Sequence, residues 1–236
     1  MKTLIDLHTH TIVSGHAYST VQENVQAAKE KGLKYIGLSD HAPSMPGGPH
    51  EFYFNNQYCI PDEINGVRVL KGIEANIMDY DGNIDVSEEL AMNMDYLIIS
   101  LHSPCIPGGT VEENTRAVIK AMNHNKVKVI GHLDDSRYMV DYDKVVSTAK
   151  EKNIALEINN SSLKPRSFRV GAKENIKALL AACKKYEAKV IMGSDAHISF
   201  DVGNFIYSEE AIQLNDFPKE LVINYNEDLI EQLIKG

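Results

Sequence analysis

The chain has no tryptophan, only three cysteines and no long apolar run. Cys59, Cys105 and Cys183 lie far apart and form no CxxC pair, which argues against a disulfide framework and against a cysteine-based zinc site. No apolar run approaches the roughly 18 residues that a membrane span needs, and the amino-terminal segment turns polar too soon for a signal peptide. We therefore expect a cytoplasmic protein that has no membrane partner.

Basic residues are also scarce relative to acidic ones. The 236 residues include 24 lysines and arginines against 33 aspartates and glutamates, a net charge of −9. Because phosphate backbones bind basic surfaces, this balance argues against extended nucleic acid as a partner. The hydrophobic fraction of 43 % is ordinary for a folded globular protein, so the nine histidines are the unusual feature of the composition.

Short apolar segments alternate with helical patterns along the chain. Strands are expected at 4–8, 35–39, 68–75, 96–101, 127–131, 154–158 and 189–193, and helices at 21–31, 111–123, 142–152, 173–186, 204–214 and 227–235. The strand ends recur at about the length of one βα unit, and no linker interrupts the series. We expect one α/β barrel domain over residues 1–236, incomplete or distorted because only seven strands can be assigned.

Potential metal ligands stand at or just after the carboxyl ends of successive strands, which is the face where barrel enzymes build their active sites. They are His8, His10, His16, His41, Glu74, His102, His132, Asp195 and His197. His8 and His10 are two residues apart, so both side chains project to the same side of an extended strand, and Asp195 and His197 repeat this spacing. A single histidine at a strand end is usually a hydrogen-bonding residue, so the evidence lies in the whole set.

Nine nitrogen and oxygen ligands exceed the four to six that one divalent ion usually takes. They suffice for two or three ions, particularly if Glu74 bridges, and a site without thiolates suits Zn, Mn or Fe with positions open for water. Asp6, Asp40 and Glu157 are expected to support the ligands rather than to bind metal. His124 is expected at the surface. His50 is a candidate for contact with the substrate.

Six ordered motifs resemble those of the PHP (polymerase and histidinol phosphatase) family. They are Asp6-Leu7-His8-Thr9-His10, Ser39-Asp40-His41, Gly72-Ile73-Glu74, Leu101-His102, Gly131-His132 and Gly193-Ser194-Asp195-Ala196-His197. The segments SGHAYST, GIEANI and EINNSS are most similar to the small single-domain YcdX-type phosphatases. The resemblance implies a distorted (β/α)7 barrel with a trinuclear metal site at the carboxyl ends of the parallel strands.

The resemblance also implies which residues hold each ion. One ion would take His8, His10, Glu74 and Asp195; a second would share Glu74 and add His102 and His132; the third would take His16, His41 and His197. The implied activity is hydrolysis of phosphate monoesters by a hydroxide that bridges the metals, with Glu74 and Asp195 as the catalytic carboxylates around it. The implied partner is a small phosphorylated substrate.

Two arginines follow the sixth expected strand, and we expect Arg166 or Arg169 to bind the phosphate. An amidohydrolase-type C–N hydrolase is the first alternative, but such sites usually place a bridging lysine on the fourth strand, which here ends in His102. A PHP nuclease or phosphodiesterase that acts on short nucleic acid is the second. The family's frequent proline-containing continuation after His132 is replaced by Leu133-Asp134-Asp135, which affects the expected loop shape and substrate selectivity.

Overall fold

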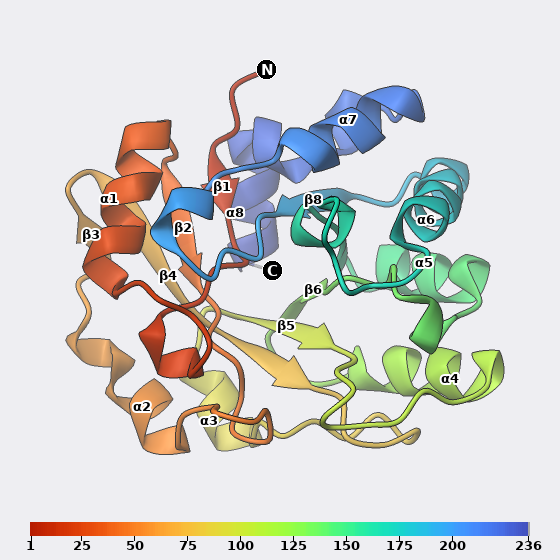
Figure 1. Ribbon diagram of the computed structural model, residues 1–236, viewed down its shortest axis with the longest axis horizontal. Helices are drawn as coiled ribbons and strands as arrows, with labels where there is room; N and C mark the ends of the chain where they lie inside the picture. Colours follow the sequence, from red (N-terminus) through yellow and green to blue (C-terminus); the bar gives the residue numbers. More distant parts are fainter. Residues whose placement is uncertain (236) are drawn as a thin grey trace.

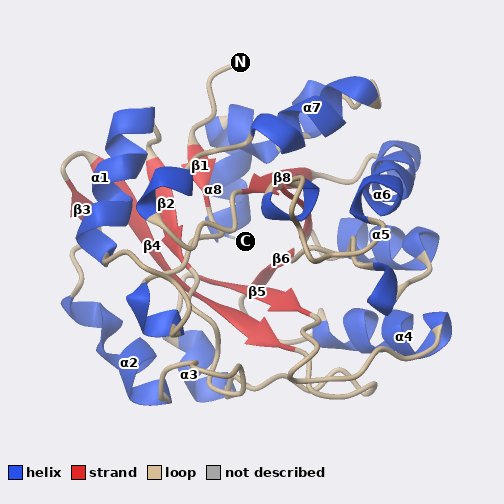
Figure 2. Ribbon diagram, viewed as in Figure 1, coloured by secondary structure: helices blue, strands red, loops and turns tan. Residues whose placement is uncertain are grey.

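The computed structural model describes residues 1–235, and its centre is a ring of parallel strands with helices outside it (Figures 1 and 2). In spatial order the strands are β1 (Ile5–Asp6), β2 (Tyr35–Leu38), β4 (Val67–Asn76), β5 (Tyr96–Ser100), β6 (Val127–Ile130), β7 (Ala155–Asn159) and β8 (Val190–Gly193). All neighbours in this order pair in parallel, and β3 (Glu63–Ile64) pairs antiparallel with β4. The expected distorted (β/α)7 barrel is confirmed.

The helices follow the strands in the expected alternation. They are α1 (Val21–Lys31), α2 (Glu51–Asn55), α3 (Glu88–Met92), α4 (Val111–Ala121), α5 (Tyr142–Glu151), α6 (Ala172–Tyr186), α7 (Ile206–Leu214) and α8 (Glu227–Lys235). The bounds of α1 are those predicted: Thr20 and Glu23 cap each other at its start, and Gly32 ends it in a left-handed conformation. Among the residues described, no helix is long and apolar enough to cross a membrane.

The seam between β1 and β8 closes without an eighth strand of the barrel. Thr9 forms a parallel bridge with Ala196 just beyond the two strand ends. Nearer the amino ends of the strands, the buried Asn224 fills the gap: its Oδ1 accepts a hydrogen bond from Met192 N at 2.7 Å, and its Nδ2 donates to Ile5 O at 2.9 Å. The side chain thus supplies hydrogen bonds that a neighbouring strand would otherwise provide.

The barrel interior is apolar at one end and polar at the other. Leu70, Gly72, Glu74 and Asn76 alternate along β4, so all four face the interior from the apolar end to the carboxyl end. Gly72 is required because a Cβ there would lie 2.4 Å from the ring of Tyr96, which fills the middle of the barrel. The apolar end is a cluster closed by α8, with Ile5, Leu70, Tyr96, Ile98, Val129, Ala155, Ile191, Ile223, Ile230 and Leu233.

Candidate metal centre

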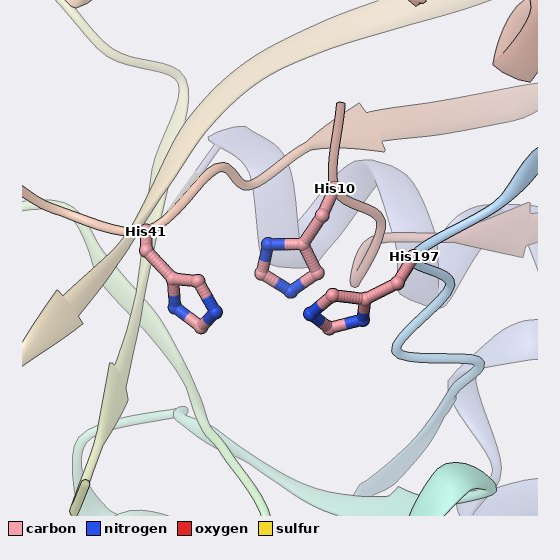
Figure 3. A group of neighbouring side chains, drawn as sticks. All are labelled: His10, His41 and His197. Carbon is pink, nitrogen blue, oxygen red and sulfur yellow. The ribbon is translucent and has the colours of Figure 1, made fainter. Parts of the chain in front are cut away.

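Four histidine rings gather where the chain leaves β1, β2 and β8. The ring of His10 lies 4.3 Å from those of both His41 and His197, and Figure 3 shows these three side chains pointing toward one another. The ring of His16 stands 5.0 Å from that of His41 and 4.8 Å from that of His197, on the exposed side of the group. Two of the four, His10 and His41, are buried.

Glu74 lies at the centre of the remaining ligand candidates. Its Oε1 is 2.9 Å from His132 Nε2, 3.2 Å from His102 Nε2 and 3.4 Å from His8 Nε2. Its Oε2 is 2.7 Å from His41 Nδ1 and 3.6 Å from His10 Nε2. The carboxylate is completely buried. Its two oxygens face two different groups of imidazoles, which is the arrangement that a bridging ligand requires.

Asp195 is the second carboxylate of the cluster. Its Oδ1 lies 3.3 Å from His10 Nε2 and 3.6 Å from His8 Nε2, while its Oδ2 is 3.2 Å from Arg169 Nη1. Asp195 (φ 53°) and His132 (φ 23°) both have left-handed backbone conformations, which are uncommon outside glycine. Such conformations cost about 1–3 kcal/mol each and cluster at functional sites.

The donor atoms lie close enough to hold metal. Four triplets have all their donor atoms within 4.8 Å of one another: His10, His41 and His197; His8, Glu74 and His132; His8, His10 and Asp195; and His41, Glu74 and His102. His8 Nε2, His10 Nε2 and His41 Nε2 are buried without a hydrogen-bond partner in the part of the chain described. His41 Nδ1 and Glu74 Oε2 lie 2.7 Å apart but without hydrogen-bond geometry, and neither has another partner there. Buried polar atoms are normally paired, so these orphaned donors fit bound cations.

Glu157 on β7 supports two of the ligand candidates at once. Its Oε1 accepts a hydrogen bond from His8 Nδ1 at 2.6 Å, and its Oε2 accepts one from the backbone N of His132 at 2.8 Å. This contact leaves His8 Nε2 free for the cluster. A glycine at position 193 makes room, because a Cβ there would lie 1.9 Å from Glu157 Oε1. The supporting role predicted for Glu157 agrees with this geometry.

Asp40 supports the amino-terminal loop of the site. Its carboxylate accepts hydrogen bonds from Thr11 N, Ser14 Oγ and Tyr53 OH at 2.6–2.8 Å. Ser14 Oγ is in turn 3.3 Å from His10 Nδ1. Asp6 accepts hydrogen bonds from backbone amides, including His8 N and Ser194 N, and so ties β1 to the segment after β8. Both aspartates therefore hold the ligand loops, as predicted.

A fourth support, Asn76, was not predicted from the sequence. Asn76 Oδ1 is 2.7 Å from His102 Nδ1, while Asn76 Nδ2 donates to Asp85 Oδ2 at 2.7 Å. Because the amide nitrogen of Asn76 donates to Asp85, its amide oxygen faces the imidazole of His102. This oxygen can only accept a hydrogen bond, so His102 carries its proton on Nδ1. The Nε2 atom of His102, which faces Glu74, is then unprotonated. The available signal was the position of Asn76, two residues after Glu74 on the same inward face of β4.

Charge in the cluster favours anionic carboxylates. Burial alone raises the pKa of Glu74 and of Asp195, but the surrounding imidazoles, and Arg169 beside Asp195, hold both well below their usual range. Burial lowers the pKa of His10, and lowers that of His102 to about 4. His8 differs: burial lowers its pKa, but the carboxylates of Glu157, Glu74 and Asp195 raise it well above the ordinary value.

The two candidate phosphate-binding arginines lie in different surroundings. The side chain of Arg169 is 8 % exposed, and its Nη1 donates to Ser162 Oγ at 2.9 Å and to Asp195 Oδ2 at 3.2 Å. Its Nε and Nη2 have no protein partner within residues 1–235. Arg166 is exposed. His50 is also exposed and caps α2, where its Nδ1 accepts a hydrogen bond from Phe52 N.

Two further residues have distinct environments. Asp134 is buried with neither carboxylate oxygen partnered among the described residues, and burial raises its pKa to about 6. Asp134 belongs to the segment Leu133-Asp134-Asp135, which stands after His132 in place of the family's frequent proline-containing continuation. His124 lies outside the cluster, where its Nε2 is 3.0 Å from Gly82 O, consistent with the surface position expected for it.

Comparison with known proteins identifies relatives along the whole chain. The family model described as "PHP domain" matches residues 6–161. A protein of Clostridium acetobutylicum named "probable phosphatase" is 48 % identical over 236 residues, which is all of this chain and 96 % of that protein. A "probable phosphatase" of Clostridium novyi is 44 % identical over the same extent.

A solved structure shares the fold. Histidinol phosphate phosphatase from Lactococcus lactis, complexed with zinc, L-histidinol and phosphate, superposes with a TM-score of 0.61 and 18 % identity, over 92 % of this chain and 95 % of that one. The structural likeness supports the barrel, while the sequence matches establish kinship. From its ordered motifs, its matching family model and its full-length relatives, we conclude that this chain belongs to the PHP family.

Proposed function

We propose that this chain is a metal-dependent phosphatase that hydrolyses small phosphate monoesters at a trinuclear centre, and that residues 1–236 form one catalytic domain. The observation that carries the proposal is the group of buried imidazole nitrogens and carboxylate oxygens that converge at the carboxyl ends of the strands, several of them without a hydrogen-bond partner among the described residues. The names of the relatives and the zinc and phosphate in the Lactococcus lactis structure support it.

We assign the ligands to three groups, two of which share Glu74. His8, His10, Glu74 and Asp195 would hold one ion; Glu74, His102 and His132 a second; and His16, His41 and His197 the third. Zn, Mn and Fe all suit this donor set. When bound, such ions lower the pKa of coordinated water toward 7 and stabilise charge on a phosphoryl group in the transition state.

The protein's own residues orient the substrate. Arg169 is fixed through Nη1, so its free Nε and Nη2 can donate two parallel hydrogen bonds to the non-bridging oxygens of a phosphoryl group. Asp195 holds this guanidinium next to the cluster, while Ser162 and Asn159 fix its plane. We therefore assign the phosphate contact to Arg169 rather than to the exposed Arg166.

Phosphate release tests the proposal directly. Wild-type protein loaded with Mn or Zn is expected to release phosphate from p-nitrophenyl phosphate, and Glu74→Gln is expected to lose at least a hundredfold in kcat because a bridging ligand is removed. His124→Gln is the matched control outside the cluster and should retain full activity. A loaded wild-type protein that releases no phosphate but hydrolyses a cyclic amide would instead support the C–N hydrolase alternative.

A further inference from the structure

Two loops next to the metal centre are joined into one surface. The loop after β6 and the loop after β7 meet where Ser136 N donates to Val170 O at 2.9 Å. Asn175 at the start of α6 strengthens the junction, since its Nδ2 donates to Asp134 O at 2.8 Å and to Ser136 Oγ at 3.0 Å. These contacts therefore fix the two loops relative to each other.

Phe168 is an exposed aromatic ring on this joined surface. Phe168 is 72 % exposed, and it directly precedes Arg169 in the sequence. The guanidinium carbon of Arg169 lies 5.4 Å from the centre of its ring, and that of Arg137 lies 5.6 Å away. Both distances are within the range of cation–π contacts, so two guanidinium groups lie against the ring.

Each guanidinium group beside the ring also contacts a carboxylate. Asp135 accepts hydrogen bonds from Arg137 Nε at 2.9 and 3.0 Å, and Asp195 accepts one from Arg169 Nη1. The Arg137 guanidinium therefore already faces a carboxylate, whereas Nε and Nη2 of Arg169 stay free for the phosphoryl group. What this surface offers to a ligand is an exposed aromatic ring with two guanidinium groups against it, and such groups stack on planar rings.

We propose that Phe168, with Arg137 beside it, binds an aromatic ring in the leaving group of the substrate, so that the preferred substrates are phosphate monoesters of aromatic or heteroaromatic alcohols. The inference rests on the proposed phosphatase function, because it places the phosphoryl group at Arg169. The leaving group of an ester held there would lie within reach of the neighbouring ring of Phe168. Phe168 is thus a specificity-determining residue and not a metal ligand.

Matched substrates separate aromatic stacking from simple apolar contact. Benzyl phosphate and cyclohexylmethyl phosphate have similar size and similar leaving alcohols, but only the first has a π-face. We expect Phe168→Ala to lower kcat/KM about tenfold for benzyl phosphate and less than threefold for cyclohexylmethyl phosphate, mainly through KM. Phe168→Tyr should restore the preference, and Phe200→Ala, at a similarly exposed phenylalanine, should leave both values unchanged.

A binding measurement keeps this inference separate from the proposed function. Calorimetric titration with benzylphosphonate and cyclohexylmethylphosphonate, which cannot be hydrolysed as esters, should show the same tenfold loss for the aromatic ligand alone in Phe168→Ala. Equal losses for both ligands, or no loss for either, would overturn the role of Phe168. Selective loss of benzylphosphonate binding in a protein that releases no phosphate would retain the aromatic site and reject the phosphatase.

Discussion

At the scale of single residues, the site depends on side chains that set which nitrogen of each imidazole faces the cluster. Glu157 holds the Nδ1 proton of His8, and Asn76 does so for His102. Each contact leaves Nε2 available as a ligand atom. Asn76 acts as an acceptor because Asp85 occupies its amide nitrogen, so a residue in a surface hairpin fixes the protonation of a buried histidine.

Replacing Asn76 by leucine removes this control. We expect Asn76→Leu to weaken metal binding by about 10- to 100-fold, because His102 loses the acceptor that keeps its Nε2 free. Competition titrations with a metal-binding dye measure the change. Asp79→Asn is the matched control, since Asp79 stabilises the same hairpin but does not contact Asn76. Equal metal affinity in Asn76→Leu and wild type would contradict the role of Asn76.

The two arginines after β7 should differ in their effect on substrate binding. Arg169→Gln is expected to raise KM for p-nitrophenyl phosphate at least tenfold, because two charge-assisted hydrogen bonds to phosphate are lost. Arg166→Gln should change KM less than twofold. Steady-state kinetics on variants with equal metal content check both values, and a larger effect at Arg166 would reverse the assignment.

His8 makes metal binding depend on pH. The carboxylates around it raise its pKa well above the ordinary value, so protons compete with a metal for this ring up to a higher pH than they would for a free imidazole. The affinity for metal is therefore expected to increase as the pH rises toward the pKa of His8 and to decrease as the pH falls. His102, whose pKa is about 4, contributes no pH dependence to metal binding above pH 6. Calorimetry at pH 7 in buffers of different ionisation enthalpy should detect about one proton released; no release would contradict this account.

At the scale of elements, the seam between β1 and β8 is held by a side chain from a segment that is not a strand. Asn224→Ala is expected to lower the free energy of unfolding by about 3 kcal/mol, because Met192 N and Ile5 O remain buried without partners. Urea titration measures the change. Asn123→Ala, at an exposed helix end, should cost less than 1 kcal/mol, and equal losses in the two variants would show that the seam does not depend on Asn224.

Much of the element order follows from local signals in the sequence. The helix over 21–31 was predicted to the residue because its capping residues and terminal glycine are local. The helix expected at 111–123 ends at Ala121, and the one expected at 204–214 begins at Ile206, since no capping side chain marks those boundaries. The strand expected at 4–8 pairs only over Ile5–Asp6. The helices α2 and α3 are too short to leave a periodic pattern.

The candidate ligands could be predicted because they stand at or just after the ends of strands, which a parallel barrel brings to one face. Their supports could not be predicted in the same way. Asp85 reaches Asn76 from a hairpin, and Asn224 reaches the β1–β8 seam from beyond α7, so both contacts depend on three-dimensional packing. Arg169 and Arg166 are equivalent in sequence, and only the fold of their loop turns one of them inward.

At the scale of the whole molecule, the barrel collects residues from His8 to His197 into one site on a protein of net charge −9. Three divalent ions would add about +6 at the carboxyl ends of the strands, so an anionic phosphate ester would meet a cationic centre inside an acidic protein. The acidic exterior would then disfavour long nucleic acid, while the centre would accept the small phosphorylated substrate that we propose.

The metal content of the purified, manganese-reloaded protein tests this account most directly. Elemental analysis is expected to find three ions per chain in the wild type. His16→Ala is expected to retain two, because His16 serves only the exposed group with His41 and His197. His124→Gln should retain all three. A wild-type protein that binds a single ion, or a His16→Ala variant that still binds three, would contradict the trinuclear centre.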